Sequence, residues 1–211
     1  MKEYKLPIGC DVPETIILAD GDFPSHPLAL EWLRQCPYVV CCDGAANTYI
    51  RSGRMPEAIV GDGDSLLPDI KERYASLIHS EAEQETNDLS KAFRFCLSQE
   101  RKRITIMGAT GKREDHTIGN VSLLADYMEQ AEVSMMTDYG IFVPIREDSM
   151  FESYIGQQIS VFNMNSTALS AEGLAYPLSV FTNWWQGTLN EALAKHFIIR
   201  TEGKVLVFRT F

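Results

Sequence analysis

The first two-thirds of the chain alternate short apolar runs with stretches in which apolar residues recur at helical spacing. The short runs, rich in Ile, Val and aromatic side chains, predict buried β-strands, and the periodic stretches predict helices. Strands are expected at Thr15–Ala19, Tyr38–Cys42, Ala58–Val60, Leu77–His79, Ile104–Met107 and Val133–Met136. Helices are expected at Pro27–Gln35, Ala45–Ser52, Pro68–Tyr74, Asp88–Leu97 and Thr117–Met128. This alternation indicates βαβ units and a mostly parallel sheet.

From about Tyr139–Pro144 onward the sequence reads as strands separated by turns. Further strands are expected at Gln158–Asn163, Leu174–Leu178, His196–Arg200 and Lys204–Arg209. The last two are joined by Thr201-Glu202-Gly203, which predicts a β-hairpin. We therefore expect an α/β domain over residues 1–144, followed by an all-β domain over residues 145–211.

Composition narrows the class of partner. The chain has 211 residues, 45% of them hydrophobic, enough for a sizeable core. Its net charge of −10 disfavours nucleic acid or an anionic membrane as a partner, because both need a basic face. Residues 146–211 hold 5 of the 19 Lys and Arg and 6 of the 29 Asp and Glu. The acidic excess therefore lies in the first domain.

The five cysteines include no CxxC pair. This disfavours zinc and a disulfide framework and favours reduced thiols in a cytosolic protein. No apolar run is long enough to span a membrane, and the first residues lack the apolar core of a signal peptide. We expect a cytoplasmic protein without a membrane partner.

Two carboxylates stand two residues apart on a glycine turn directly after Ala58–Val60. In Gly61-Asp62-Gly63-Asp64-Ser65 they fall at the expected carboxyl end of a parallel strand, the edge where ligands bind in open sheets. Two anions this close repel each other unless a cation lies between them, and Mg²⁺ shared with substrate phosphates is the usual one. An Asp/Gly-rich surface turn would explain the same residues. The other polar segments of the chain are therefore needed to distinguish a metal site from a surface turn.

Three further polar segments follow expected strands and open expected helices. Asp43-Gly44-Ala45-Ala46-Asn47 offers small residues that let backbone N–H groups approach a ligand at a helix start. Gln84-Glu85-Thr86-Asn87-Asp88 opens the next helix, where any of its last three residues could simply be the N-cap. The segment from Gly108 to His116 combines a glycine-flanked loop with Lys112, Arg113 and an Asp-His pair.

Together these segments place carboxylates, glycine turns and a Lys/Arg-bearing loop at one edge of the sheet. Hard-ion ligands, close backbone donors and guanidinium groups are the components of a Mg²⁺–polyphosphate site. The chain contains no GxxxxGK[ST] P-loop, no strand-linked GxGxxG and no GxSxG elbow. P-loop, dinucleotide and serine-hydrolase chemistry are therefore disfavoured.

The ordered motifs DGAAN, GDGDS, QETND and GATGKREDH, with a β-rich tail carrying GLAYPL and GTLNE, resemble the thiamine pyrophosphokinase family from Thr15 to the end. The resemblance implies transfer of a pyrophosphoryl group from ATP to the thiamine hydroxyl, with Mg²⁺ as cofactor and AMP as product. It implies a homodimer in which residues 1–144 form a Rossmann-like nucleotide- and metal-binding domain. Residues 145–211 would form a β-sandwich that binds thiamine and dimerises.

The resemblance also assigns roles to residues of this sequence. Metal-binding carboxylates match Asp62, Asp64 and Asp88. Phosphate contact and charge stabilisation match Gln84 and the Arg113–Asp115 segment. The other nucleotide-binding positions are Asp43, Gly44, Asn47 and Asn87, and Asn190 matches an asparagine of the thiamine pocket.

This chain departs from the family pattern at three positions. Asn87 stands where Thr is usual, Gly63 where an aromatic residue is common, and Leu189 where Ser is expected. Because Leu189 removes a hydroxyl from the implied thiamine pocket, a pyrophosphokinase for another alcohol, such as a pterin, is one alternative. A non-catalytic thiamine or nucleotide sensor is another, although binding alone does not need three carboxylates.

Five residues have competing or alternative interpretations. Asp88 and Asp115 are both candidates to take the hydroxyl proton, whereas we interpret His116 as a helix-start residue. Trp184 and Trp185 could stack on a cationic thiazolium ring, but we interpret them as core or dimer-interface residues.

Overall fold

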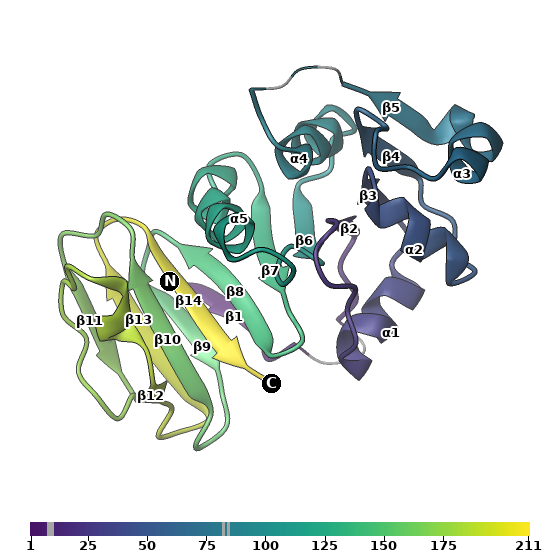
Figure 1. Cartoon of the computed structure of the whole chain (residues 1–211). Helices are drawn as coiled ribbons and strands as arrows, with labels where there is room; N and C mark the ends of the chain where they lie inside the picture. Colours follow the sequence, from purple (N-terminus) through teal and green to yellow (C-terminus); the bar gives the residue numbers. More distant parts are fainter. Residues whose placement is uncertain (8–10, 82, 84) are drawn as a thin grey trace.

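The apolar runs of the first two-thirds form the parallel part of a ten-stranded sheet (Figure 1). The computed structural model describes residues 1–7, 11–81, 83 and 85–211. The sheet has the order β12-β10-β14-β8-β7-β6-β2-β3-β4-β5. Its parallel strands are β2 (Thr15–Leu18), β3 (Val39–Cys42), β4 (Ala58–Gly61), β5 (Ile78–Ser80), β6 (Arg103–Met107) and β7 (Glu132–Met136). All six strands expected in this region are confirmed, and so is the mixed α/β class.

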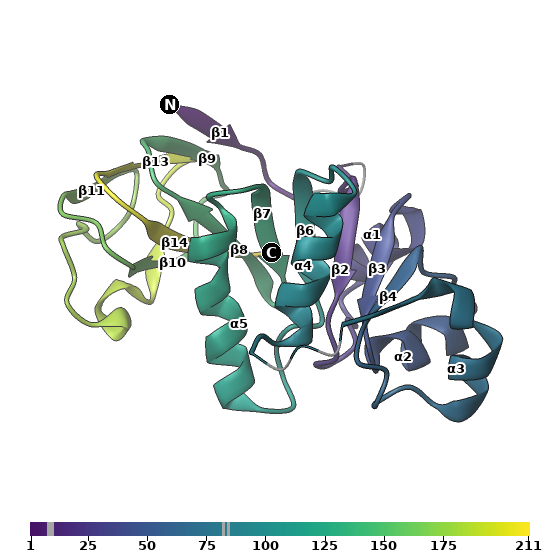
Figure 2. The same cartoon turned by 90° about the horizontal axis from the view of Figure 1, so that it is seen from above.

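Helices cover both faces of the parallel strands (Figures 1 and 2). One face carries α1 (Pro27–Gln35), α2 (Ala45–Arg51), α3 (Pro68–Arg73) and the short 3₁₀ helix η1 (Ala75–Leu77). The other face carries α4 (Asp88–Ser98) and α5 (Glu114–Tyr127). Phe93 of α4 stacks on Tyr127 of α5 with ring centroids 3.9 Å apart, which fixes the two helices to each other and to the sheet. Both faces of the strands are therefore buried, as their uninterrupted apolar sequences require.

Helix α5 begins three residues earlier than the sequence pattern suggested. Its first residue is Glu114 rather than Thr117, so Asp115 and His116 lie in the first helical turn. Two acidic residues at a helix start interact favourably with the positive end of the helix dipole. This early start carries the end of the GATGKREDH motif into the helix.

Beyond β7 the sheet continues with antiparallel strands. β8 (Gly140–Ile145) pairs with β7 and with β14 (Val205–Thr210), and β10 (Gln158–Asn163) and β12 (Asn190–Glu191) follow. A second sheet has the order β1-β9-β13-β11. Its strands are β1 (Lys2–Tyr4), β9 (Ser149–Glu152), β13 (His196–Thr201) and β11 (Leu169–Glu172). Phe151 and Phe197 of this sheet stack at 5.0 Å in a core shared with Val207 of the large sheet.

Two predictions for the tail are wrong. The residues around Thr201-Glu202-Gly203 do not form a hairpin, because β13 pairs with β9 and β11 while β14 pairs with β8 and β10. The turn instead carries the chain from one sheet to the other, so both strands face the same core from opposite sides. No strand forms at Leu174–Leu178, where Leu174 makes only an isolated bridge to Ala192.

The first strand joins the smaller sheet rather than the parallel one. β1 pairs with β9, and the chain then crosses to β2 in the middle of the large sheet. Arg209 of β14 fixes this crossing: its Nη2 donates to the Lys5 carbonyl at 2.9 Å and its Nη1 to the Glu152 carbonyl at 2.7 Å. Burial lowers the pKa of this guanidinium to about 10. No described helix is long and apolar enough to cross a membrane.

Candidate functional site

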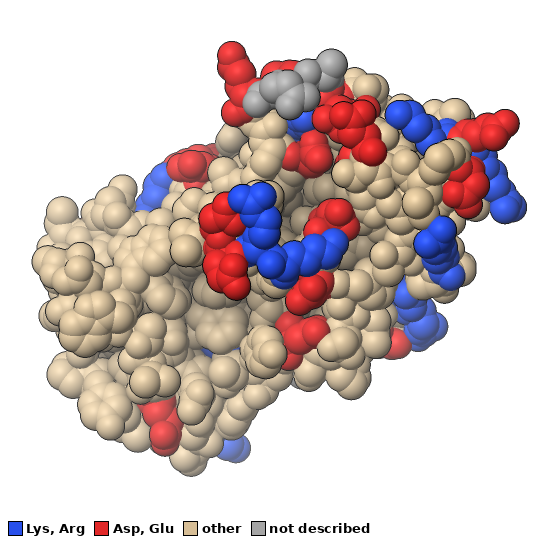
Figure 3. Space-filling view, in the orientation of Figure 1, with Lys and Arg blue, Asp and Glu red and all other residues tan. Residues whose placement is uncertain are grey.

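The carboxyl ends of the parallel strands and the starts of two helices enclose a pocket of about 480 Å³. Acidic, basic and glycine residues from four separate segments line it. The lining residues are Ala19, Asp20, Gly21, Cys42, Asp62, Thr86, Asn87, Asp88, Leu89, Lys91, Ala109, Gly111, Lys112, Arg113, His116 and Asn120. Figure 3 shows acidic and basic side chains gathered near the middle of one face, while the surface over the C-terminal strands carries few charges.

Asp43 is a buried carboxylate directly after β3, only 3% exposed. Its backbone has a left-handed φ of 27°, uncommon for a non-glycine residue. The Ser65 backbone N–H donates to its Oδ2 at 3.0 Å, whereas Oδ1 has no hydrogen-bond partner among the described residues. Burial raises the pKa of Asp43, and the negative charges of Asp88 and Asp62 raise it further. Three carboxylates therefore act on one another at this end of the sheet.

The GDGDS turn places its two carboxylates differently. Asp62 lines the pocket, and its Oδ1 accepts a hydrogen bond from the Asp64 N–H at 3.1 Å. The Asp64 side chain is exposed and is not part of the lining. Gly63 has a left-handed φ of 79°, and its carbonyl accepts a hydrogen bond from Lys71 Nζ at 3.1 Å. The lysine thus ties the turn to α3.

Helix α4 begins at the pocket. Asn87 is its N-cap, with a side chain that accepts from the Ser90 N–H at 2.9 Å. Asp88 is the first helical residue, and Lys91 Nζ donates to its Oδ1 at 3.1 Å. The capping interpretation of Asn87 is confirmed, and its position also brings its side chain to the pocket.

Two exposed cations reach the pocket from the loop after β6. Lys112 Nζ donates to the backbone and the side chain of Asp20, at 2.9 and 3.0 Å. Arg113 holds Asp115 through two hydrogen bonds, of 3.0 Å from Nε and 2.5 Å from Nη2. The bond to the guanidinium lowers the pKa of Asp115 to about 2, so this carboxylate is not a proton acceptor at neutral pH while the pair persists.

Glycines hold the loops after β2 and β6 against each other. The Gly21 N–H donates to the Gly108 carbonyl at 2.6 Å, and the Asp22 N–H donates to the Thr110 carbonyl at 2.9 Å. A Cβ on Gly21 would stand 2.3 Å from the Thr110 oxygen, and one on Gly111 would stand 2.1 Å from Asp22 Oδ2. Only glycine allows this approach.

The predicted site residues do not all meet in the pocket. Asp62, Asn87, Asp88 and Arg113 line it. Asp43 lies beside the carboxylates, and Gly44 caps α2. Asn47 links α2 to the loop after β4, through bonds to the Ser65 carbonyl and the Leu67 N–H. Gln84 lies outside the described residues.

Sequence reasoning missed three lining residues with charged or amide side chains: Asp20, Lys91 and Asn120. Asp20-Gly21-Asp22 follows β2 directly and has the same carboxylate-glycine composition as GDGDS, so the same criterion would have found it. Lys91 and Asn120 lie inside helices, and no local signal distinguishes them from ordinary helix-surface residues.

Oxygen donors at the pocket suit a magnesium ion that is shared with a substrate. Asp62 and Asp88 line the pocket, and the orphaned Oδ1 of buried Asp43 lies in the same charge cluster. Among the described residues, no three His, Cys, Asp or Glu side chains form a group that could hold a metal ion. Mg²⁺ commonly takes only one or two carboxylates, together with waters and substrate phosphates. The residues present therefore fit Mg²⁺ brought in with a phosphate ligand better than a metal held by protein alone.

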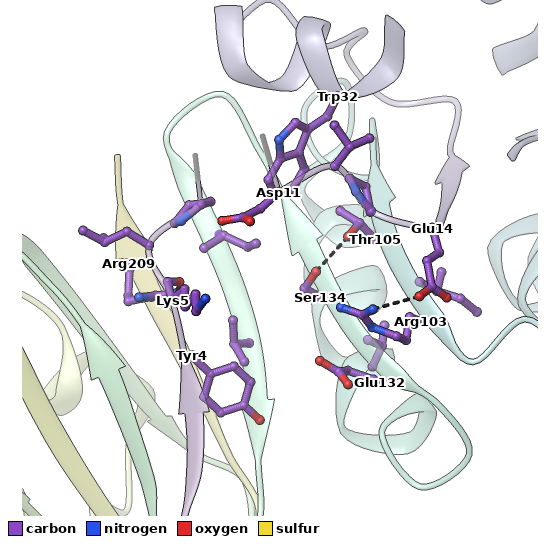
Figure 4. A pocket seen from close by; sticks show the side chains of 18 of the residues that line it. Tyr4, Lys5, Asp11, Glu14, Trp32, Arg103, Thr105, Glu132, Ser134 and Arg209 are labelled. Carbon is purple, nitrogen blue, oxygen red and sulfur yellow. Dashed lines mark hydrogen bonds and ion pairs between the residues drawn. The ribbon is translucent and has the colours of Figure 1, made fainter. Parts of the chain in front are cut away.

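A second cavity, of about 560 Å³, lies away from these groups (Figure 4). It is lined by the segment from Glu3 to Glu14 as far as that segment is described, by Trp32, and by the first residues of β6 and β7. Its charged groups include Arg103, which is paired with Glu14 at 2.8 Å. It is larger, but it lies at the amino ends of the strands and has no glycine turns, so we place the candidate site at the carboxyl ends.

Asn190, Trp184, Trp185 and Leu189, the tail residues considered from the sequence, lie outside both cavities. Asn190 is buried, and its carboxamide bonds to the backbone N–H and carbonyl of Tyr176, so it holds the loop before β12 in place. Trp184 and Trp185 are 43% and 73% exposed, which excludes a core position for them in the isolated chain. Leu189 is 76% exposed and has a left-handed φ of 62°.

Two family models match consecutive parts of the chain. The model described as thiamin pyrophosphokinase, catalytic domain, matches residues 29–136, and the model described as thiamin pyrophosphokinase, substrate-binding domain, matches residues 140–208. The chain belongs to the thiamin pyrophosphokinase family. The resemblance inferred from the four ordered motifs is thereby confirmed.

Relatives and solved structures of the family are similar to this chain to different extents. Thiamine pyrophosphokinase 1 from Oryza sativa is 30% identical over 129 residues, covering 49% of each chain. Thiamine pyrophosphokinase from Bacillus subtilis is 34% identical over 86 residues, covering 39% of this chain and 40% of that one. The chain spans about half the length of the curated relatives that it matches most extensively.

The structural matches extend further. The structure of thiamin pyrophosphokinase from Candida albicans has a TM-score of 0.81 at 18% identity, covering 100% of this chain and 93% of that one. The Bacillus subtilis structure has a TM-score of 0.77 at 21% identity, covering 93% and 98%. At these identities the likeness shows the fold.

Proposed function

We propose that this protein transfers a pyrophosphoryl group from ATP to the hydroxyl of thiamine, releasing AMP. The observation that carries the proposal is the family match of residues 29–136 together with the pocket that those residues build at the carboxyl ends of the strands. The pocket combines carboxylates, closely approaching backbone and the two exposed cations Lys112 and Arg113, which is the chemistry of a polyphosphate site.

In this proposal the cations take the phosphate chain and the carboxylates take its metal. The side chains of Arg113 and Lys112 reach the pocket from the same loop. Both would exchange their carboxylate partners, Asp115 and Asp20, for phosphate oxygens. The planar guanidinium of Arg113 matches two phosphate oxygens at once. Thiamine's hydroxyl oxygen would attack the β-phosphorus, with AMP as the leaving group, and catalysis would consist chiefly of positioning and electrostatics.

Asp62, Asp64 and Asp88 are the proposed Mg²⁺ ligands. When bound, the metal would neutralise charge on the phosphate oxygens. Asp62 and Asp88 already line the pocket, whereas Asp64 would turn inward from the surface of the same tight turn. Because Arg113 would release Asp115 when it binds phosphate oxygens, Asp88 and Asp115 both remain candidate proton acceptors.

The direct test is incubation of the whole chain with ATP, Mg²⁺ and a panel of alcohols that includes thiamine and a pterin alcohol. Mass analysis should find AMP and thiamine diphosphate in equal amounts. Product from the pterin instead would identify another acceptor, and ATP binding without any product would identify a sensor.

We further infer that the two parts of the chain divide the work in a homodimer. Residues 1–144 would bind nucleotide and metal as a Rossmann-like unit, and residues 145–211 would bind thiamine and dimerise as a β-sandwich. The support is a series of exposed apolar side chains between residues 176 and 193 of the tail: Tyr176, Val180, Trp184, Trp185, Leu189 and Leu193. Exposed apolar surface that is contiguous marks interaction sites, and the left-handed backbone of Leu189 is a strain typical of binding loops.

Complementation between two inactive variants tests a shared site. One variant carries Asp64→Asn and the other Asn190→Ala, which removes the carboxamide that matches the thiamine pocket and that bonds to the Tyr176 backbone. If each site uses both chains, one of the two sites in a mixed dimer collects both lesions and the other collects none. Mixed dimers should then regain about half of normal activity. Mixed dimers without activity would show that each chain builds its own site.

A further inference from the structure

A buried lysine lines the pocket and has no part in the reaction described above. Lys91 lies in the first turn of α4, with only 3% of its side chain exposed, and belongs to the pocket lining. Moving an ammonium group from water into protein is costly unless its charge is paired and its hydrogens are bonded. The surroundings of Lys91 should therefore show what offsets this cost.

The ammonium group has more hydrogens than its described partners accept. Lys91 Nζ donates to Asp88 Oδ1 at 3.1 Å, and its ion pair is with the same carboxylate. An ammonium group carries three N–H donors, so two lack an acceptor in the part of the chain that the structure describes. Because Lys91 lines the pocket, an acceptor bound there can meet the remaining donors.

Pairing with Asp88 alone does not explain this burial. The Asp88 side chain is 36% exposed, so water can solvate its charge without a buried counter-ion. The other two cations of the pocket are arranged differently: Lys112 and Arg113 have side chains 54% and 66% exposed, where water satisfies their spare donors. Of these three cations, Lys91 gains most from a bound anion.

We propose that Lys91, from helix α4, binds an oxygen of the substrate's polyphosphate chain in the pocket that Lys112 and Arg113 also line. Phosphate oxygens are strong acceptors for charged donors, and one would satisfy donors that protein leaves open. This inference rests on the proposed function only in that a polyphosphate enters the pocket. It does not depend on which alcohol receives the transferred group. The ligand class is a nucleoside triphosphate, recognised here through its phosphates.

Calorimetric titration of the whole chain with α,β-methylene-ATP tests the proposal, since this analogue blocks transfer and leaves binding as the readout. The titration is run in EDTA and again with Mg²⁺, and inorganic triphosphate and AMP are titrated separately. Lys91→Met should weaken binding of the analogue about 10- to 100-fold in EDTA, the range for a lost hydrogen bond to a charged group. Inorganic triphosphate should lose affinity similarly, and AMP by less than about threefold, because it lacks the chain.

Lys102→Gln is the matched control. Lys102 is an exposed lysine that precedes β6 at the opposite end of the strands, and its loss removes the same formal charge. Its variant should bind the analogue like the wild type. If Lys102→Gln lost as much affinity as Lys91→Met, the loss would result from the change in net charge and not from a contact between Lys91 and phosphate, and the proposal would be overturned.

A purely structural role predicts a different result. A counter-ion for Asp88 would alter the melting temperature of Lys91→Met but leave its affinity for the analogue unchanged in EDTA. If Lys91→Met does not fold, Lys91→Gln keeps a polar side chain and serves in its place. A folded variant with affinity within twofold of wild type overturns the proposal, as does wild-type protein that binds neither the analogue nor triphosphate. If wild type binds the analogue but forms no product from thiamine, the proposed function fails while the assignment of Lys91 stands.

Discussion

Replacing Gly21 with alanine tests whether the contact between two loops sets the geometry of the site. The new Cβ would stand 2.3 Å from the Thr110 carbonyl oxygen and 2.4 Å from the Gly108 carbonyl oxygen. Carbon–oxygen contacts of this kind normally lie at about 3.3 Å or more, so the loops must separate by about 1 Å. Both oxygens belong to the backbone, so no side-chain rotation relieves the clash.

The separation has a cost in stability and a larger one in rate. It disrupts the hydrogen bonds from the Gly21 N–H and the Asp22 N–H to the facing loop. At about 1 kcal/mol each, their loss lowers the free energy of unfolding by about 2 kcal/mol, or about 4–8 °C in melting temperature for a chain of this size. The loop that moves carries Lys112 and Arg113, and a misplacement of about 1 Å can cost about 100-fold in rate.

The assay is steady-state release of AMP from ATP and thiamine, paired with thermal melting. Gly119→Ala is the control: Gly119 lies inside α5, and a Cβ there meets nothing within 4 Å. Alanine in place of a helix-interior glycine should raise stability by about 0.5–1 kcal/mol and leave the rate unchanged. The reasoning is refuted if Gly21→Ala keeps its rate within threefold of wild type and its melting temperature does not change.

Three other predictions follow from the site and the core. Asp62→Asn and Asp88→Asn should both abolish turnover. In EDTA only Asp88→Asn should melt at a lower temperature than wild type, because it leaves buried Lys91 without its carboxylate partner. Turnover by both variants would show that neither residue belongs to the site. Arg113→Lys should lower kcat by about 10- to 100-fold with little change in KM for ATP, since lysine keeps the charge but loses the bidentate fork; steady-state kinetics measure this, and a raised KM alone would contradict it. Burial raises the pKa of the Cys96 thiol to about 12, so the unfolded chain, with an ordinary thiol pKa of 9.0, loses this proton first as pH rises. The melting temperature should therefore fall as pH rises from 9 to 12, and it should fall less steeply in Cys96→Ala. Equal slopes for the variant and the wild type would contradict the raised pKa of Cys96.

Local sequence pattern predicted the parallel half of the fold well, for a physical reason. Strands such as Val39–Cys42 and Ala58–Gly61 are buried on both faces, so their apolar runs are unbroken and easily recognised. The tail was predicted less well, because the alternating pattern of a short half-buried strand indicates which residues face a core but not which strand is its neighbour in the sheet. His196–Thr201 and Val205–Thr210 are adjacent in sequence, yet they lie in different sheets.

The same distinction applies to the candidate site. Asp62, Asp88 and Arg113 could be found because glycine turns and helix starts mark their positions in sequence. Lys91 could not, since a lysine in a helix is usually solvated and its burial depends on the packing of α4 against the sheet. The placement of Asp43 next to Asp62 and Asp88 likewise results from strand order, which the sequence does not state.

The position of β1 in the fold affects the order in which parts of the chain can fold during synthesis. Arg209 closes the crossing of the N-terminal segment by donating to the Lys5 carbonyl, 204 residues earlier in the chain. At about 5–20 residues per second, a ribosome needs about 10–40 s to make that interval. The parallel strands and their helices can assemble in this time. Lys2–Tyr4 remain unpaired until Ser149–Glu152, their partner strand, has been synthesised. The contact between Arg209 and Lys5 is thus among the last to form, and an N-terminal fusion that occupies β1 should slow this step without changing the pocket at the carboxyl ends of the parallel strands.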